Sequence, residues 1–248
     1  MENYQVFATV YDDLMDKSLY PLWRDYVTKR VPAQSKILEL ASGTADLAKL
    51  LLQQGFDVTV SDLSAEMLDL AVANLEEIPH DVEIYQFDMR EFDFAGQYDA
   101  AICFDDSICY LSDEQEVLTT FKNVAASLKN HGKFLFDCHS LYQMDEVFPE
   151  YMFNEINDDY TFVWKSFEGE QPHSIEHVLQ IFVPETETAT SKYQLFEEIH
   201  RERTYEIATY QKLLAQAGFE VKSVTSDFTD TLDQAHGRRI FFECEKVN

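Results

Sequence analysis

The sequence predicts an α/β fold built on a mostly parallel sheet. Residues 36–138 alternate short apolar runs with segments of helical period. Such alternation is typical of βαβ units, whose crossover connections make neighbouring strands parallel. A composition with 46% hydrophobic and 26% charged residues is that of a folded chain rather than a disordered one. The length of 248 residues fits one elaborated domain of this class.

The elements of this pattern follow one another regularly. The predicted strands are the runs KILELA, DVTVSD, VEIYQFD, YDAAICF and KFLFD. The run TADLAKLLLQQG is a helix that Gly55 caps at its C-terminal end. The helix after Ser64 has an apolar face made of Met67, Leu70, Ala71, Leu75 and Ile78. A capping box at residues 112–115 opens a third helix, which Gly132 ends.

Residues 139–203 change to a period of two, which predicts antiparallel strands inserted into the α/β pattern. A helix closed by Gly218 and the strands FEVKSVTSDF and RRIFFECE then complete the main sheet. Near the N-terminus, Pro21 suits the first turn of a helix that Pro32 terminates. We therefore expect a single domain over residues 1–248, with N-terminal helices over 1–31 and an inserted β cap over 139–203.

Charge and cysteine usage narrow the location and the partners. The 46 acidic and 19 basic residues give a net charge of −27, which repels phosphate backbones and anionic lipids. Nucleic acid and membrane surfaces are therefore not expected as partners. No signal peptide follows Met1, and no apolar run approaches the roughly 20 residues of a spanning helix. The four cysteines form no C-x-x-C pair, so we expect a cytoplasmic protein with reduced thiols and no zinc site.

Ligands of an open parallel sheet bind outside the carboxyl ends of its strands, so residues there are candidates for a site. Glu39 lies within an apolar strand, where an unpaired carboxylate is costly to bury, and Gly43 lets the backbone approach a ligand closely. An ordinary βα turn is the alternative interpretation. Asp62, at the end of the second strand, can accept hydrogen bonds from both hydroxyls of a ribose. The alternative is that Asp62 caps the helix that begins near Ser64.

Two more strand ends carry suitable side chains. Asp88 and Met89 follow the third strand, where a carboxylate can recognise a base and a thioether can pack on it. A solvated loop aspartate is the alternative for Asp88. Phe104, Asp105 and Asp106 follow the fourth strand. Four such strand ends in register predict a site the size of a nucleoside.

This arrangement resembles the class I S-adenosylmethionine-dependent methyltransferases. Their first motif, E/D-x-G-x-G-x-G, is matched by Glu39, Ala41, Gly43 and Ala45, so alanine replaces two of the three glycines. We expect φ to be negative at both alanines, because alanine strongly prefers that region. The resemblance covers residues 36–138 and implies a seven-stranded Rossmann-like sheet in the order 3-2-1-4-5-7-6, ending in an antiparallel hairpin.

The resemblance also implies the contacts of the cofactor, S-adenosyl-L-methionine. Its methionine end would lie against Glu39, Ala41 and Gly43. Its adenosine would be bound through Asp62, Leu63, Asp88, Met89 and Phe104. The segment VYDDLM resembles a lid helix of such enzymes, and its Tyr11 would face the sulfonium, since aromatic rings attract cations. A core aromatic is the alternative for Tyr11.

The cap region supplies the candidates on the acceptor side. His139 follows the fifth strand and His200 lies in EIHRERTY; either could act as a base near neutral pH, or be a structural histidine. Asp106 and Arg203 are candidates for contacting the acceptor. His173 and His177 have helical spacing within a segment of period two, so we expect no metal site there.

We therefore predict in-line transfer of a methyl group to nitrogen or oxygen of a small molecule enclosed by the cap, in a monomer or homodimer. The protein's part is orientation, exclusion of water and, where the acceptor must lose a proton, a base. One alternative is a non-catalytic module that binds the cofactor or dimerises through the cap. An NAD(P)-dependent oxidoreductase is the other, but ASGTAD lacks the G-x-G-x-x-G fingerprint and the chain has no Y-x-x-x-K pair.

Overall fold

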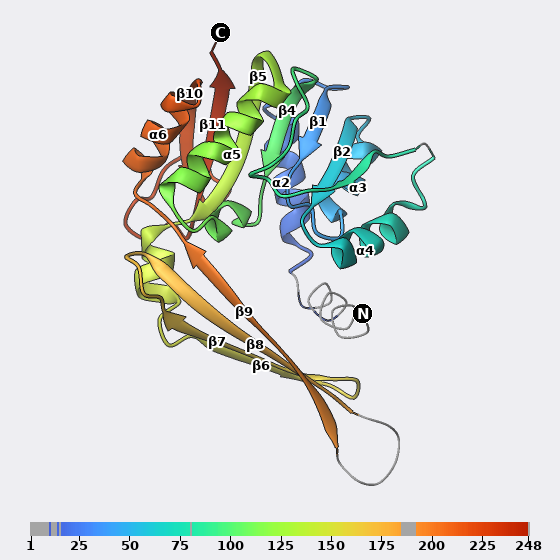
Figure 1. Cartoon of the computed structure of the whole chain (residues 1–248), viewed down its shortest axis with the longest axis vertical. Helices are drawn as coiled ribbons and strands as arrows, with labels where there is room; N and C mark the ends of the chain where they lie inside the picture. Colours follow the sequence, from blue (N-terminus) through green and yellow to red (C-terminus); the bar gives the residue numbers. More distant parts are fainter. Residues whose placement is uncertain (1–9, 11–13, 15, 80, 185–191, 248) are drawn as a thin grey trace.

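The structure is a computed structural model that describes residues 10, 14, 16–79, 81–184 and 192–247. A seven-stranded sheet with helices on both faces forms the main body, and a second, antiparallel sheet extends from it (Figure 1). The main sheet has the strand order β10-β11-β5-β4-β1-β2-β3. Its strands are β1 (Lys36–Glu39), β2 (Asp57–Asp62), β3 (Ile84–Gln86), β4 (Tyr98–Cys103), β5 (Leu128–His139), β10 (Phe219–Ser226) and β11 (Arg239–Lys246).

The topology of this sheet agrees with the prediction. Neighbours among β1 to β5 are parallel, whereas β11 is antiparallel to β5 and β10 is antiparallel to β11. Read from β3, and numbered without the inserted strands, the order is 3-2-1-4-5-7-6, which is confirmed. The chain leaves the central strands β1 and β4 toward opposite edges, so the switch point of the sheet lies between their carboxyl ends.

Alternation along the central strands builds two cores, one on each face of the sheet. Ile37, Ala100 and Leu135 pack on the face covered by α2 (Leu19–Thr28), α3 (Asp46–Gln53) and α4 (Ala65–Leu75). Leu38 and Phe134 point to the other face, covered by α5 (Glu114–Ser127) and α6 (Ile207–Gln216). No helix among the described residues is long and apolar enough to cross a membrane.

Two local predictions were wrong in detail. Helix α4 buries Leu68 with Ala71 and Leu75, so its inward face is rotated away from Met67 and Leu70. The N-cap of α5 is Asp113, whose carboxylate accepts from the Glu116 backbone N–H at 2.9 Å, while the Glu116 carboxylate accepts from the N–H of Ser112. The capping box therefore begins one residue later than expected.

The third helix also ends earlier than predicted. It stops at Ser127, and Gly132 lies inside β5 rather than at the end of the helix. The sequence does not show where the helix ends, because β5 follows α5 directly, without a separate turn.

The cap is a four-stranded antiparallel sheet, as its period of two predicts. Its strands lie in the order β6 (Met152–Ile156), β7 (Thr161–Glu168), β8 (Ser174–Pro184) and β9 (Tyr193–Arg203). The short helical segment η2 (Gln143–Val147) connects β5 to this sheet. The cap lies on the side to which the parallel strands direct their carboxyl ends, and it reaches beyond the main body as a long ribbon (Figure 1).

Candidate active site

The turn after β1 is tightly wound because three alternate residues have positive φ: Ala41 at 50°, Gly43 at 54° and Ala45 at 63°. The expectation of negative φ at the two alanines is therefore wrong. Hydrogen bonds impose the conformation instead of glycine: the Ser42 N–H donates to the Ser61 carbonyl at 2.9 Å and the Ala45 N–H to the Ser42 carbonyl at 2.9 Å. A Cβ atom on Gly43 would meet nothing within 4 Å, so the space above the turn is open.

Asp62 joins this turn to the end of β2. Its carboxylate accepts from the backbone N–H of Gly43 at 2.8 Å and from that of Ser64 at 2.9 Å. The cap of α4 is Ser64, whose hydroxyl accepts from the Met67 N–H, so Asp62 is not itself the N-cap. Burial raises the pKa of Asp62, and hydrogen bonds from the backbone N–H groups of Ser64, Gly43 and Leu63 partly offset this rise. Leu63, next to it, is 64% exposed, so its side chain is accessible to a ligand.

Glu39 ends β1 beneath the turn as a buried carboxyl group. It is only 4% exposed, and its Oε2 atom has no hydrogen-bond partner among the described residues. Burial, with the negative charges of Asp46 and Asp62, raises the pKa of Glu39 to about 8. A buried polar atom without a partner is expensive. The ammonium group of a methionine moiety has the charge and the donors that would satisfy it, so the residues present fit S-adenosylmethionine.

Asp88 and Met89 lie beyond β3, as the sequence places them. Arg90 binds the Asp88 carboxylate, with its Nε 2.9 Å from Oδ1, and also pairs with Glu116 on α5. The hydrogen bond from Arg90 outweighs burial and lowers the pKa of Asp88, which keeps the carboxylate ionised. Met89 packs against the core on the α5 face.

Phe104 is 5% exposed, and its ring contacts those of Trp23, Tyr26 and Phe241 in the core beneath α2. Little of the ring is left for a ligand, although the residue directly follows β4. Tyr11, the residue expected near the sulfonium, lies outside the described residues.

A second group of charged side chains gathers at the carboxyl ends of β4 and β5. Asp105 and Asp106 both have left-handed backbone, with φ of 55° and 49°. Arg239, at the start of β11, pairs with Asp106 at 2.6 Å, with Asp137 of β5 at 3.1 Å and with Asp105 at 3.2 Å. Asp137 is fully buried and also accepts from the Trp23 indole N–H at 2.7 Å. Residues of α2, β5, β11 and the loop after β4 thus form one cluster.

His139 links this cluster to the cap. Its Nε2 lies 3.0 Å from Asp106 Oδ2 and 3.3 Å from Glu202 Oε2, and Glu202 belongs to β9. Burial lowers the pKa of His139, but the two carboxylates outweigh it and raise this pKa to about 10. The residue is therefore an imidazolium at neutral pH, whose positive charge holds the two carboxylates together. An imidazolium has no lone pair with which to accept another proton.

We call this set the acidic centre. It comprises Asp105, Asp106, Asp137 and Glu202 together with Arg239 and His139. The sequence predicted His139 and Asp106 as site residues but gave no role to Asp137 or Glu202. Asp137 carried a usable signal, because a carboxylate inside the apolar run KFLFD raises the same burial argument as Glu39. Glu202 carried none, since its contact depends on how the cap docks.

The other two acceptor-side candidates have partners outside the acidic centre. The His200 Nδ1 lies 2.8 Å from the Tyr110 hydroxyl, and its Nε2 lies 3.0 Å from Glu198. Arg203 lies with its guanidinium carbon 4.8 Å from the centre of the Tyr205 ring. His200 shares a face of β9 with Glu202, whereas Arg203 points the other way.

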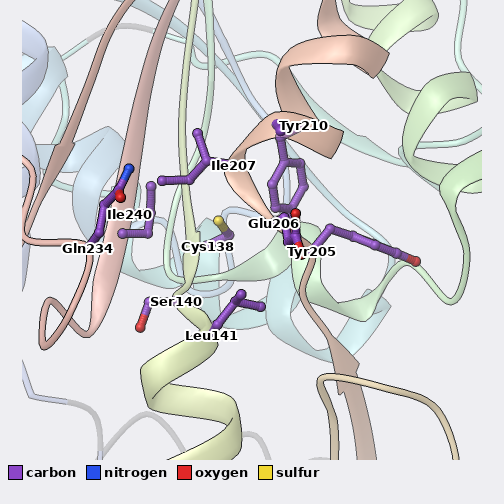
Figure 2. Close-up of a pocket in the computed structure, with 10 residues that line it drawn as sticks. Cys138, Ser140, Leu141, Tyr205, Glu206, Ile207, Tyr210, Gln234 and Ile240 are labelled. Atoms are coloured by element: carbon purple, nitrogen blue, oxygen red, sulfur yellow. The ribbon is translucent and has the colours of Figure 1, made fainter.

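A separate cavity of about 310 Å³ opens on the face of the sheet that α5 and α6 cover (Figure 2). Its lining includes Cys138, Ser140 and Ile240, with Tyr205 and Tyr210 beside the start of α6. Because alternate residues of a strand point to opposite faces, Cys138 of β5 and Ile240 of β11 face away from their neighbours His139 and Arg239. The cavity is therefore distinct from the acidic centre.

Known proteins resemble this chain over its whole length. The model of the methyltransferase domain family matches residues 37–132. YqeM of Bacillus subtilis, a protein named as a methyltransferase, is 38% identical over 98% of this chain and 97% of its own. A glycine/sarcosine N-methyltransferase of Halorhodospira halochloris is 30% identical over 65% of this chain and 71% of its own.

Among solved structures, an S-adenosylmethionine-dependent methyltransferase from Clostridium acetobutylicum superimposes with a TM-score of 0.84. It is 25% identical, and the match covers 99% of both chains. The turn, the strand order and these relatives agree with one another. The chain belongs to the class I S-adenosylmethionine-dependent methyltransferases.

Proposed function

We propose that this enzyme methylates an amine nitrogen of a small molecule held between the carboxyl ends of β4 and β5 and the cap. The observation that carries the proposal is the acidic centre, where four carboxylates face only two cationic side chains. Such a surplus of negative charge favours a cationic ligand over a neutral or anionic one. The name of the glycine/sarcosine N-methyltransferase supports the choice of nitrogen over oxygen.

S-adenosylmethionine, when bound, supplies an activated methyl group that a nucleophile can displace from sulfur. In this proposal Glu39 and the turn of Ala41 and Gly43 hold the methionine end, and Asp62 accepts from the ribose hydroxyls. Leu63, Asp88 and Met89 bind the adenine. The protein's remaining tasks are to align the acceptor and to exclude water from the reacting atoms.

The cysteines bear on the location proposed for the protein. All four cysteines are buried and free, which supports the reducing, cytoplasmic environment expected from the sequence. We retain a small-molecule acceptor as the partner and a monomer or homodimer as the assembly. Size measurement by light scattering tests the assembly.

Calorimetric titration with S-adenosylmethionine and S-adenosylhomocysteine, with NADH as control, tests the cofactor site. Asp62→Ala should weaken binding by about 1.5–3 kcal/mol, the range for hydrogen bonds to a charged group. Asp57→Ala, which removes an exposed carboxylate at the amino end of β2, the end opposite Asp62, should leave affinity unchanged. If Asp62→Ala binds S-adenosylmethionine within twofold of wild type, the assignment of Asp62 to the ribose is wrong.

The acceptor is tested with methyl-labelled S-adenosylmethionine and a panel of small amines, beginning with glycine and sarcosine, against matched alcohols. Transfer to amines alone supports the proposal. Transfer to alcohols alone contradicts the nitrogen assignment. Cofactor binding without transfer to any member of the panel would favour the non-catalytic alternative.

A further inference from the structure

We propose that Asp105 is the catalytic base, the group that removes a proton from the acceptor's ammonium before methyl transfer. The inference rests on the proposed function, because it needs an amine acceptor in the acidic centre. It replaces both histidines considered from the sequence. Of the four carboxylates in the acidic centre, Asp105 is the one placed to accept a proton from a ligand.

Three of the carboxylates are already committed to cationic or N–H partners. Asp106 lies between Arg239 at 2.6 Å and His139 at 3.0 Å, and it is the residue whose backbone N–H donates to Asp137 at 2.9 Å. Asp137 takes that N–H, the Trp23 indole and Arg239. Glu202 pairs with His139. Side-chain exposures of 14%, 0% and 5% for the three carboxylates leave little access for a substrate.

Asp105 differs in access and in pairing. Its side chain is 32% exposed, and Arg239 approaches its Oδ1 at 3.2 Å, leaving Oδ2 for a ligand. Arg239 therefore fixes the orientation of the carboxylate. The backbone at Asp105 is left-handed, with φ of 55°, a strained conformation that is commonly kept at functional sites.

The position of Asp105 suits a group that acts on the acceptor. It lies two residues beyond β4, the strand beside β1 at the switch point. The Leu40 N–H donates to the Ile102 carbonyl at 2.9 Å, which ties the end of β4 directly to the cofactor turn. The cap docks on the same side through Glu202 and His139, so Asp105 lies between the two proposed binding regions.

The charges around Asp105 favour proton uptake. Burial and the neighbouring negative charge of Asp106 raise its pKa, with a further rise from Asp137, whereas Arg239 and His139 act to lower it. A raised pKa brings a carboxylate closer to the range in which it exchanges protons with an amine at neutral pH. By the same electrostatics Asp106 is held ionised, since Arg239 and His139 outweigh its burial and lower its pKa.

The proposed step balances. The acceptor R–NH₃⁺ gives one proton to the Asp105 carboxylate and becomes R–NH₂. The freed electron pair forms the N–CH₃ bond as the S–CH₃ bond breaks, giving R–NH₂⁺–CH₃ and neutral thioether. Asp105 then releases its proton to solvent after the product leaves.

The test compares wild type with Asp105→Asn, which keeps shape and removes the base, and with Asp105→Glu, which keeps the carboxylate. With the amine found in the acceptor screen, Asp105→Asn should lose about 100-fold or more in kcat, the lower end for a general base. Its affinity for S-adenosylmethionine should stay within twofold. The rise of kcat with pH should disappear in Asp105→Asn and return in part in Asp105→Glu. A kcat within threefold of wild type would overturn the proposal.

A second measurement does not depend on the acceptor. Wild type and Asp105→Asn, both labelled with ¹³C at the aspartate carboxyls and loaded with S-adenosylhomocysteine, are titrated by NMR. The Asp105 resonance, identified as the one missing from the variant, should titrate above the usual aspartate range in wild type. Asp62 and Asp137, whose pKa values burial also raises, keep their resonances in both proteins. Titration of Asp105 in the usual range or below refutes the base role even if no acceptor is found. Failure of the proposed function itself shows separately, as a wild-type enzyme that transfers no methyl group to amines.

Discussion

The two alanines of the turn after β1 give a stability prediction that depends on backbone conformation alone. Ala41 and Ala45 have φ of 50° and 63°, in a region that glycine adopts freely and other residues adopt at a cost. The cost for an L-residue in the left-handed region is about 1–2 kcal/mol. Against this, glycine gains freedom in the unfolded chain, which costs the folded state roughly 0.4–1 kcal/mol.

The two positions differ in what the methyl group contacts. Ala41 is partly exposed, so Ala41→Gly should raise the free energy of unfolding by about 0.5–1 kcal/mol, the difference between those terms. Ala45 is fully buried in the core under α3, and removing its methyl group forfeits about 0.8 kcal/mol. Ala45→Gly should therefore change stability by about zero.

Urea unfolding of the ligand-free protein, followed by circular dichroism, measures both changes. Ala73→Gly, at an exposed position of α4, is the matched control and should lower stability by about 0.8–1 kcal/mol. If Ala41→Gly is destabilising by as much as Ala73→Gly, the strain argument is wrong. If Ala41→Gly and Ala45→Gly stabilise the protein equally, the loss assigned to the buried methyl group of Ala45 is wrong.

Three further predictions concern buried polar groups. The pKa of His139 is raised from 6.5 to about 10, so its contribution to stability is complete below pH 6.5 and is lost as pH rises through 10. In urea unfolding measured across this pH range, His139→Gln should therefore lose less stability with rising pH than wild type does. The pKa of Glu39 is raised from 4.5 to about 8, so the ligand-free fold loses stability as pH rises from 4.5 through 8. Glu39→Gln should be more stable than wild type to urea at pH 9, yet calorimetry should show weaker binding of S-adenosylmethionine. Trp23→Phe leaves the buried Asp137 without one donor and should cost about 1–3 kcal/mol, with a smaller loss when Asp137→Asn is also present.

Much of the fold followed from periodicity because the pattern is local. Strand–helix alternation over residues 36–138 and the change to period two in the cap were readable without tertiary information. The predictions that were wrong concern the inward face of α4 and the two ends of α5. In α4, Leu68 rather than Met67 turns inward because the helix docks on the sheet at an angle that its own pattern leaves open.

The candidate site was predictable in location but not in its pairings. Glu39, Gly43 and Asp62 lie at adjacent strand ends, so parallel-sheet geometry brings them together. The pairing of His139 with Glu202 joins residues 63 positions apart through the docking of the cap. No spacing rule foresees such a contact, and without it the protonation state of His139 could not be inferred.

The surplus of carboxylates in the acidic centre also bears on the rates at which ligands arrive and leave. A protein of net charge −27 attracts cations before contact, and such steering raises association rates by about 10–1,000-fold at low salt. S-adenosylmethionine carries a sulfonium charge that S-adenosylhomocysteine lacks. The field therefore draws in the charged donor but exerts a weaker hold on the spent one, which favours exchange of product for fresh donor after each transfer.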